Sequence, residues 1–163
     1  MKLILDTSVL IAFYTELRKE HFLLSLQEHG YEMLVPEYVF RSEMKSDYEK
    51  LDEAVKRNEI TILSRIRDED IEVLKGRFPS LNRGELEVIW WGMKLRSENE
   101  LYACVLDDGK ARKCAQRSEV EIIGSLGIIE ILNDLEIISK EEKRRICETL
   151  RKKGFRMPDD YEC

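Results

Sequence analysis

The sequence predicts an α/β protein built as a three-layer α/β/α sandwich around a central parallel sheet of four to five strands. Short, continuously apolar runs alternate with stretches of helical periodicity along the chain. Such alternation is typical of parallel sheets covered on both faces, whose strands are buried on both sides. The chain has 163 residues, of which 43% are hydrophobic. We therefore expect a single domain spanning residues 1–163, with one sizeable core.

Each predicted element follows from its own stretch of sequence. The predicted strands are the apolar runs at residues 3–5, 33–35, 60–63 and 102–106, with a less regular fifth at residues 121–123. The predicted helices cover residues 8–14, 17–28, 36–44, 51–57, 68–75, 82–95, 110–116, 126–132 and 139–153. Pro36 is expected to open the third helix, in the first turn where its missing N–H is not needed. Ser139 and Glu142 form a capping-box pattern at the start of the last helix, and Gly154 ends it.

Charge and cysteine usage narrow the class of protein. The formal net charge is −6, so the chain lacks the basic character typical of nucleic-acid-binding proteins, although a local basic rim remains compatible with it. The four cysteines and two histidines show no zinc-type or redox-type spacing. We expect free thiols in a reducing cytoplasm, because Met1 leads into an apolar run without a secretory signal pattern. No apolar run is long enough to span a membrane.

Acidic residues follow two of the predicted strands. Asp6 comes directly after the run at residues 3–5, and Asp107 and Asp108 follow the run at residues 102–106. In open α/β sheets, ligands bind beyond the carboxyl ends of the strands, so these carboxylates are candidates for a shared site. Aspartates also suit helix caps and turns, and that simpler interpretation stays open for Asp107 and Asp108.

Two glutamates lie on predicted helices that could face the same edge of the sheet. Glu43 falls in an apolar stripe with Val39 and Met44, where a carboxylate is costly unless something satisfies it. A position at the edge of the stripe, reaching water or a neighbouring cation, would also explain this glutamate. Glu85 follows Asn82 by three residues, which is the spacing of a capping box as well.

A cluster of these four carboxylates would need a partner, because like charges repel and raise one another's pKa. A hard divalent cation would make the cluster favourable, and the absence of paired His or Cys ligands favours Mg²⁺ or Mn²⁺ over zinc. Such an ion helps to deprotonate a water and offsets charge on a leaving oxygen. The acids therefore indicate a site for a divalent metal ion.

Several segments resemble the PIN-domain family, which includes the VapC-type toxin ribonucleases of bacterial and archaeal toxin–antitoxin pairs. The similar segments are residues 5–11, 35–43, 83–87, 106–115, 123–128 and 154–156, so they span nearly the whole chain. The first four carry Asp6, Glu43, Glu85 and Asp107, in that order. This order is more specific than any one of the motifs, and the last two segments indicate a prokaryotic subgroup.

The resemblance implies a Mg²⁺- or Mn²⁺-dependent endoribonuclease, and the metal-ligating, catalytic acids carry over to Asp6, Glu43, Glu85 and Asp107. Asp108 could take the place of Asp107, and the hydroxyl near the first acid carries over to Ser8, or less closely to Thr7. Candidates for contacts with the RNA backbone are Lys110, Arg112 and Lys113, with Arg41 and Lys45, unless these form a solvated helix face. The resemblance also implies a homodimer and, in toxin-like members, an antitoxin that places a basic side chain into the acidic pocket.

Two other interpretations compete with the ribonuclease. In the first, the PIN fold has little catalytic activity and serves as an RNA- or protein-binding regulatory module. In the second, the chain is a phosphate-handling α/β protein of another family. A haloacid-dehalogenase-type phosphatase would have a second aspartate two residues after Asp6, where this chain has Ser8. A response-regulator receiver would have an acidic pair near the first strand, where Asp6 has no acidic neighbour.

Overall fold

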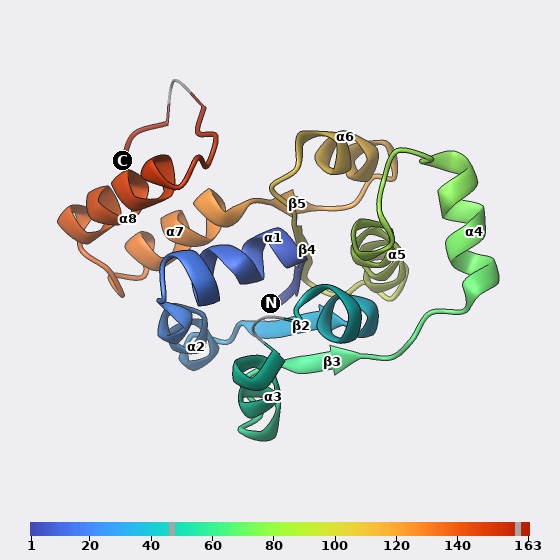
Figure 1. Cartoon of the computed structure of the whole chain (residues 1–163), viewed down its shortest axis with the longest axis horizontal. Helices are drawn as coiled ribbons and strands as arrows, with labels where there is room; N and C mark the ends of the chain where they lie inside the picture. The colour runs from blue at the N-terminus through green and yellow to red at the C-terminus, as the bar shows by residue number, and fades with distance from the viewer. Residues whose placement is uncertain (46–47, 159–160) are drawn as a thin grey trace.

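Five parallel strands form the central sheet of the described chain, which comprises residues 1–45, 48–158 and 161–163 of a computed structural model (Figure 1). The strands are β1 (Lys2–Leu5), β2 (Glu32–Pro36), β3 (Thr61–Leu63), β4 (Tyr102–Val105) and β5 (Ile122–Ile123). They lie in the order β3-β2-β1-β4-β5, and all neighbours are parallel. The predicted α/β class with a parallel central sheet is confirmed.

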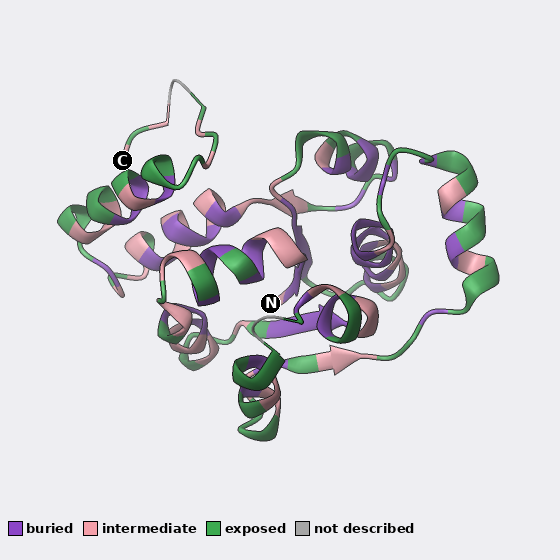
Figure 2. Ribbon diagram, viewed as in Figure 1, coloured by how far each residue is buried: buried purple, intermediate pink, exposed green. Residues whose placement is uncertain are grey.

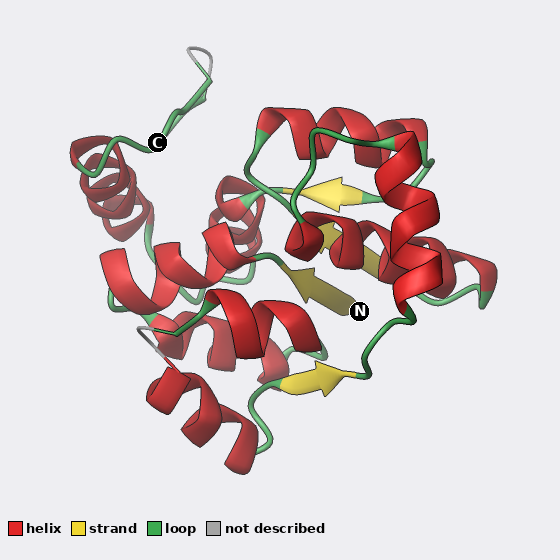
Figure 3. Ribbon diagram, turned by 45° about the vertical axis from the view of Figure 1, so that its right-hand side comes forward, coloured by secondary structure: helices red, strands yellow, loops and turns green. Residues whose placement is uncertain are grey.

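Helices cover both faces of this sheet (Figure 3). One face carries α1 (Thr7–Leu10), η1 (Ile11–Glu16), α2 (Glu20–Glu28), η2 (Val39–Glu43), α3 (Tyr48–Lys56), α7 (Ser125–Asp134) and α8 (Lys140–Lys152). The other face carries α4 (Asp68–Arg77), α5 (Arg83–Ser97) and α6 (Gly109–Arg117). The arrangement is the three-layer sandwich that the alternating pattern predicts.

Successive residues of the central strands supply two separate hydrophobic cores, one for each layer of helices. In β1, Leu3 and Leu5 pack into the core beneath α1 and α7, whereas Ile4 packs beneath α5. Side chains alternate between the two faces of a strand, so a run that is apolar at every position serves both layers. Apart from Lys2 at the start of β1 and Glu32 at the start of β2, the residues of β1, β2 and β4 are accordingly buried (Figure 2).

The strand order creates a switch point between β1 and β4. From β1 the chain moves outward through β2 and β3, then returns to the other side of β1 as β4 and continues to β5. The connections after β1 and β4 therefore leave the sheet in opposite directions, which opens a crevice beyond their carboxyl ends. Asp6 directly follows β1, and Asp107 follows β4 after one intervening residue, so both lie at this crevice.

The structure differs from the predicted elements at Pro36 and at the start of α2. Pro36 is the last residue of β2, and helical backbone begins at Glu37. A proline satisfies either position, because its fixed φ suits both and its missing N–H is not needed at a strand end or in a first helical turn. The helix predicted from residue 17 begins at Glu20, because Arg18 has a φ of 53° and interrupts it.

Two of the predicted α-helical stretches are wound as π-helices. The N–H of Leu17 donates to the carbonyl of Ala12 at 2.9 Å, and the N–H of Met44 donates to the carbonyl of Val39 at 3.1 Å. These five-residue spacings define π-helical turns, which are frequent near functional sites. The second of them, η2, ends at Glu43, so the winding sets where this carboxylate lies.

The described part of the chain contains no helix that combines the length and the apolar character needed to cross a membrane. Its four cysteines are free thiols, with Cys104, Cys114 and Cys147 buried and Cys163 partly buried.

Candidate active site

Asp6 lies at the carboxyl end of β1, in the N-cap position of α1, but its side chain does not cap that helix. The side chain is buried, with 5% of the residue's surface exposed. Oδ2 accepts a hydrogen bond of 3.0 Å from the Ser8 hydroxyl. No described residue donates a hydrogen bond to Oδ1, which is also buried. A buried carboxylate oxygen without a donor is costly, so this atom is available to a ligand.

The surroundings raise the pKa of Asp6 from 3.8 to about 7. Burial is the largest cause, because it removes the water that would stabilise the charged form. Hydrogen bonds from Ser8 and from the backbone of Thr7 oppose the rise, while the charges of Glu43 and Glu85 add to it. These three acids are therefore close enough to influence one another.

Glu43 reaches the same place from the end of η2. Its Oε2 accepts a hydrogen bond from the Thr7 hydroxyl, so the residue that follows Asp6 holds the second acid. The carboxyl group also rests on the start of α5, where a Cβ added to Gly84 would lie 2.8 Å from Glu43 Cδ. The sequence motif contained Gly84 but did not reveal this role. Only glycine leaves room there for the carboxylate.

Glu85 both caps α5 and contributes to the acidic cluster. Its Oε2 accepts a 2.8 Å hydrogen bond from the N–H of Asn82, and its own N–H donates to Asn82 Oδ1 at 2.9 Å. This is the capping box that the spacing suggested. Burial raises the pKa of Glu85, Asn82 opposes that rise, and the charges of Asp108 and Glu43 add to it. The cap engages Oε2 and leaves Oε1 for other partners.

Asp107 is held by the start of α7. Its Oδ1 accepts a 2.8 Å hydrogen bond from the N–H of Ser125, and its Oδ2 accepts a 2.7 Å bond from the Ser125 hydroxyl. Burial raises the pKa of Asp107, whereas these two bonds and the charge of Arg112 lower it. Gly124 permits the close approach, because a Cβ there would lie 2.9 Å from Asp107 Oδ1. Sequence reasoning missed Gly124 and Ser125 as neighbours of this acid.

The side chain of Asp108 forms its hydrogen bonds with the start of α6. Its Oδ1 accepts hydrogen bonds from the N–H groups of Lys110 at 2.8 Å and Ala111 at 2.9 Å, so it is the N-cap of α6. Its charge nevertheless acts on Glu85. The structure thus brings Asp6, Glu43 and Glu85 together, places Asp108 within their electrostatic reach, and ties Asp107 to Ser125.

Glu87 lies two residues after Glu85 on α5, and it is fully buried. Its Oε1 accepts a 3.1 Å hydrogen bond from Arg83, which also pairs with Asp68 at 2.8 Å. The backbone N–H of Tyr38 lies 3.4 Å from its Oε2. Glu87 therefore has its own cation and serves to anchor the first turn of α5.

The basic candidates lie around the crevice rather than in it. Lys110 and Lys113 are exposed on α6, while Arg112 donates a 2.9 Å hydrogen bond to the carbonyl of Leu106. Arg41 pairs with Glu37 at 2.9 Å. A cavity of about 560 Å³ is lined by Ser8, Asp107 and Asp108 and by residues 153–156, among others. Two of these lining residues, Lys153 and Arg156, are cations outside the set predicted from the sequence.

The donor set suits a hard divalent cation, but it is not a ready-made cage. No three His, Cys, Asp or Glu side chains among the described residues are gathered closely enough to hold a metal ion by themselves. Mg²⁺ does not require that arrangement, because it commonly uses one or two protein carboxylates together with waters and substrate phosphate oxygens. The buried Oδ1 of Asp6, the neighbouring charges of Glu43 and Glu85, and the purely oxygen donors fit such an ion.

The fold and the position of the carboxylates define a class of α/β proteins that bind their ligands at the switch point, beyond the carboxyl ends of the strands. Within that class, residues 2–161 match a family model described as a PIN domain, so the chain belongs to the PIN-domain family. Members of this family are generally nucleases, and they typically use divalent metals. No curated protein matches this chain.

Proposed function

We propose that the protein is a Mg²⁺- or Mn²⁺-dependent endoribonuclease that hydrolyses RNA phosphodiester bonds at the cluster of Asp6, Glu43 and Glu85. The observation that carries this proposal is the buried Oδ1 of Asp6, which no described residue satisfies and which lies under the influence of two further carboxylates. If these acids had no functional role, we would expect each of them to be paired with a cation, as Glu87 is paired with Arg83.

Asp6, Glu43 and Glu85 would hold the cation, with Asp108 or Asp107 at the edge of the site. When bound, a divalent ion lowers the pKa of a water and offsets negative charge on the phosphate. The hydroxyls of Ser8 and Thr7 orient the carboxylates of Asp6 and Glu43. Burial of Asp6 excludes bulk water, which strengthens every charge interaction at this point.

The cations around the crevice would hold the RNA backbone. Lys110 and Lys113 lie on α6 beyond Asp108, and Lys153 and Arg156 line the cavity beside Ser8. Contacts with phosphates release counterions, so cleavage should weaken as salt concentration rises. Arg112 is a less direct candidate than its neighbours, because it is engaged with the carbonyl of Leu106 and lies beside Asp107.

A second candidate function is a binding module with little catalytic activity. It is favoured by the full engagement of Asp107 with Ser125 and by the lack of a three-ligand cluster among the described side chains. In this case the acidic pocket would take a basic side chain from a protein partner, as an antitoxin would supply. The homodimer implied by the family resemblance also stays a prediction, which light scattering on the purified protein tests.

Cleavage of RNA by the metal-stripped protein, with Mg²⁺ or Mn²⁺ added back, tests the proposed activity. We expect cleavage only with metal, and a decrease of roughly 100-fold or more in Asp6→Asn, an effect of the order typical of catalytic groups. Asp134→Asn is the matched control, because Asp134 is an exposed aspartate on α7 that lines neither cavity around Asp107. Equal cleavage by wild type and Asp6→Asn would show that the activity arises elsewhere.

A further inference from the structure

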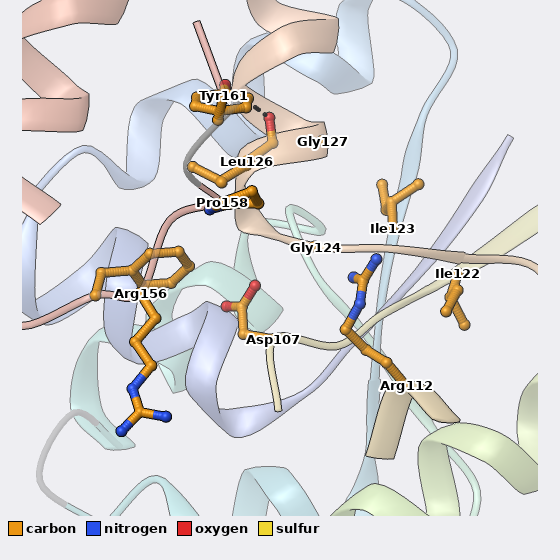
Figure 4. Close-up of a pocket in the computed structure, with 11 residues that line it drawn as sticks. Asp107, Arg112, Ile122, Ile123, Gly124, Leu126, Gly127, Arg156, Pro158 and Tyr161 are labelled. Atoms are coloured by element: carbon orange, nitrogen blue, oxygen red, sulfur yellow. Dashed lines mark hydrogen bonds between the residues drawn. The ribbon is translucent and has the colours of Figure 1, made fainter. Parts of the chain in front are cut away.

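The segment that follows α8 forms a wall of two cavities beside Asp107. Residues 153–156 line the cavity of about 560 Å³ beside Ser8. A second cavity, of about 420 Å³, has β5 and the start of α7 on one side and Phe155 and Tyr161 on the other (Figure 4). Asp107 lines both cavities, so the position of this segment determines the surroundings of that aspartate.

The end of this segment is held against α7 and α8. The Tyr161 hydroxyl lies 3.5 Å from the carbonyl of Leu126 in the first turn of α7 (Figure 4). The ammonium group of Lys143, on α8, lies 5.3 Å from the centre of the Tyr161 ring, which is within the range of a cation–π contact. The Nε of Arg144, also on α8, donates a hydrogen bond of 3.3 Å to the carbonyl of Cys163. The chain around Cys163 therefore lies against α8.

Three sulfur atoms gather where Cys163 meets α8. Cys147 follows Arg144 by three residues on this helix, so the two side chains share one of its faces. Burial raises the pKa of the Cys147 thiol, and a hydrogen bond with the Cys163 side chain and the charge of Cys163 add to the rise. The Sγ of Cys163 also lies 3.9 Å from the Sδ of Met157. The thiols of Cys147 and Cys163 are therefore direct neighbours, although the two residues lie far apart in the sequence.

The two thiols differ in what can reach them. Cys147 is fully buried, whereas Cys163 is partly exposed. A buried thiol with a raised pKa stays protonated and is inert toward reagents in solution. Cysteines that respond to oxidants are accessible and lie next to a second cysteine that resolves the first product. Cys163 has the accessibility of the attacking thiol, and Cys147 has the position of the resolving one.

We propose that Cys147 and Cys163 are a site of reversible oxidation, at which a disulfide between them fastens the segment after α8 to that helix. The oxidant is a low-molecular-weight disulfide such as oxidised glutathione. The thiolate of Cys163 attacks one of its sulfurs, which forms a mixed disulfide and releases one thiol. Cys147 gives its proton to a base in solution and attacks the Sγ of Cys163, so the second thiol leaves.

This exchange is balanced. The two protein thiols are oxidised by two electrons, and the same two electrons reduce the small disulfide to two thiols. The two protons pass through solvent to the thiols that are released. An excess of a dithiol reverses the reaction. The cross-link restricts the segment that lines both cavities, and it does so whether or not the protein cleaves RNA.

Peptide mapping of the reduced protein after treatment with oxidised glutathione tests the site. After alkylation of the remaining thiols and digestion with trypsin, we expect the peptides of residues 146–151 and 157–163 to be joined by a disulfide. Cys104 and Cys114 should remain thiols, because they are buried in the core on the other face of the sheet. Failure of the two peptides to be joined would overturn the proposal.

Single substitutions distinguish the two thiols. Cys147→Ser should accumulate glutathione on Cys163, because no resolving thiol remains. Cys163→Ser should leave Cys147 as a free thiol, since this residue is not reached from solution. Cys114→Ser is the matched control and should form the same joined peptides as wild type. Glutathione on Cys147 in folded Cys163→Ser, verified by thermal melts, would contradict the assigned order of attack.

The rate at which trypsin cleaves the folded protein after Arg156 tests the fastening of the segment. We expect cleavage to be at least about fivefold slower in the oxidised protein than in the reduced protein, because the cross-link opposes the local opening that the protease needs. Cys163→Ser treated with the same oxidant should be cleaved as fast as reduced wild type. Equal rates for oxidised and reduced wild type would overturn the proposed fastening.

Discussion

At the scale of single residues, burial gives Asp6 its unusual properties. The sequence identified this aspartate from its place after a strand, and the same pattern would describe a simple helix cap. The structure separates the two roles, because the side chain does not cap α1 and one of its oxygens has no donor among the described residues. The sequence could not predict which hydroxyl serves which acid. Ser8 bonds to Asp6 and Thr7 bonds to Glu43, and this depends on how η2 approaches β1.

The raised pKa of Asp6 predicts a dependence of stability on pH in the metal-free protein. The folded state holds a proton on Asp6 up to about pH 7, whereas the unfolded chain loses it near the ordinary value of 3.8. The folded protein therefore binds more protons between these values, and its stability falls as pH rises through this window. One pKa unit corresponds to about 1.4 kcal/mol, so the charged aspartate costs the fold roughly 4 kcal/mol at pH 8.

Asp6→Asn removes this cost, so we expect the variant to gain stability over wild type as pH rises from 5 to 8. Urea unfolding at both pH values, with chelator present, measures the difference. Asp134→Asn, which changes an exposed aspartate, should follow wild type at both values. A difference between Asp6→Asn and wild type that does not change with pH would contradict the assigned cause.

At the scale of elements, the start of α5 combines a structural and a functional role in one residue. Glu85 completes the capping box with Asn82 and also raises the pKa of Asp6. The capping box was readable from the three-residue spacing. The role in the cluster was not, because it depends on the contact of α5 with β1 and on the path of η2 across Gly84.

Substitutions of Glu85 separate the two roles. Glu85→Gln keeps an acceptor for the Asn82 N–H, since glutamine also serves in a capping box, but it removes the charge. We expect this variant to retain its melting temperature and to lose most of its metal-dependent cleavage. Glu85→Ala should lose cleavage and also be destabilised, by about 1 kcal/mol, as for other lost helix caps. A wild-type rate of cleavage in Glu85→Gln would remove this residue from the site.

At the scale of elements, the sequence did not predict which helical segments are α-helical and which are π-helical. Apolar runs and helical periodicity were sufficient for the strands and most helices, because they report which faces are buried. They did not reveal that η1 and η2 are π-helical, since stretches of six and five residues are too short for the apolar pattern to distinguish a π-helix from an α-helix. The sequence pattern also placed Pro36 in the helix rather than at the end of β2, because the fixed φ of proline suits a strand end and a first helical turn alike.

At the scale of the whole molecule, the strand order determines where function can lie. Alternating strands and helices predicted the parallel sheet, but the order β3-β2-β1-β4-β5 became visible only in the structure. That order places β1 beside β4 and opens the crevice where the acids gather. The two cavities beside Asp107 could not be predicted either, because the segment after α8 forms a wall through contacts with residues far away in sequence.

Binding of Mn²⁺ to the metal-stripped protein, measured by isothermal titration calorimetry at pH 8 on wild type and Asp6→Asn, tests the central claim that these acids hold a divalent cation. Wild type should bind the ion, and Asp6→Asn should bind it at least about tenfold more weakly, because it lacks the buried carboxylate that no described residue satisfies. Equal affinities of the two proteins, or no binding by wild type in the presence of RNA, would contradict the claim.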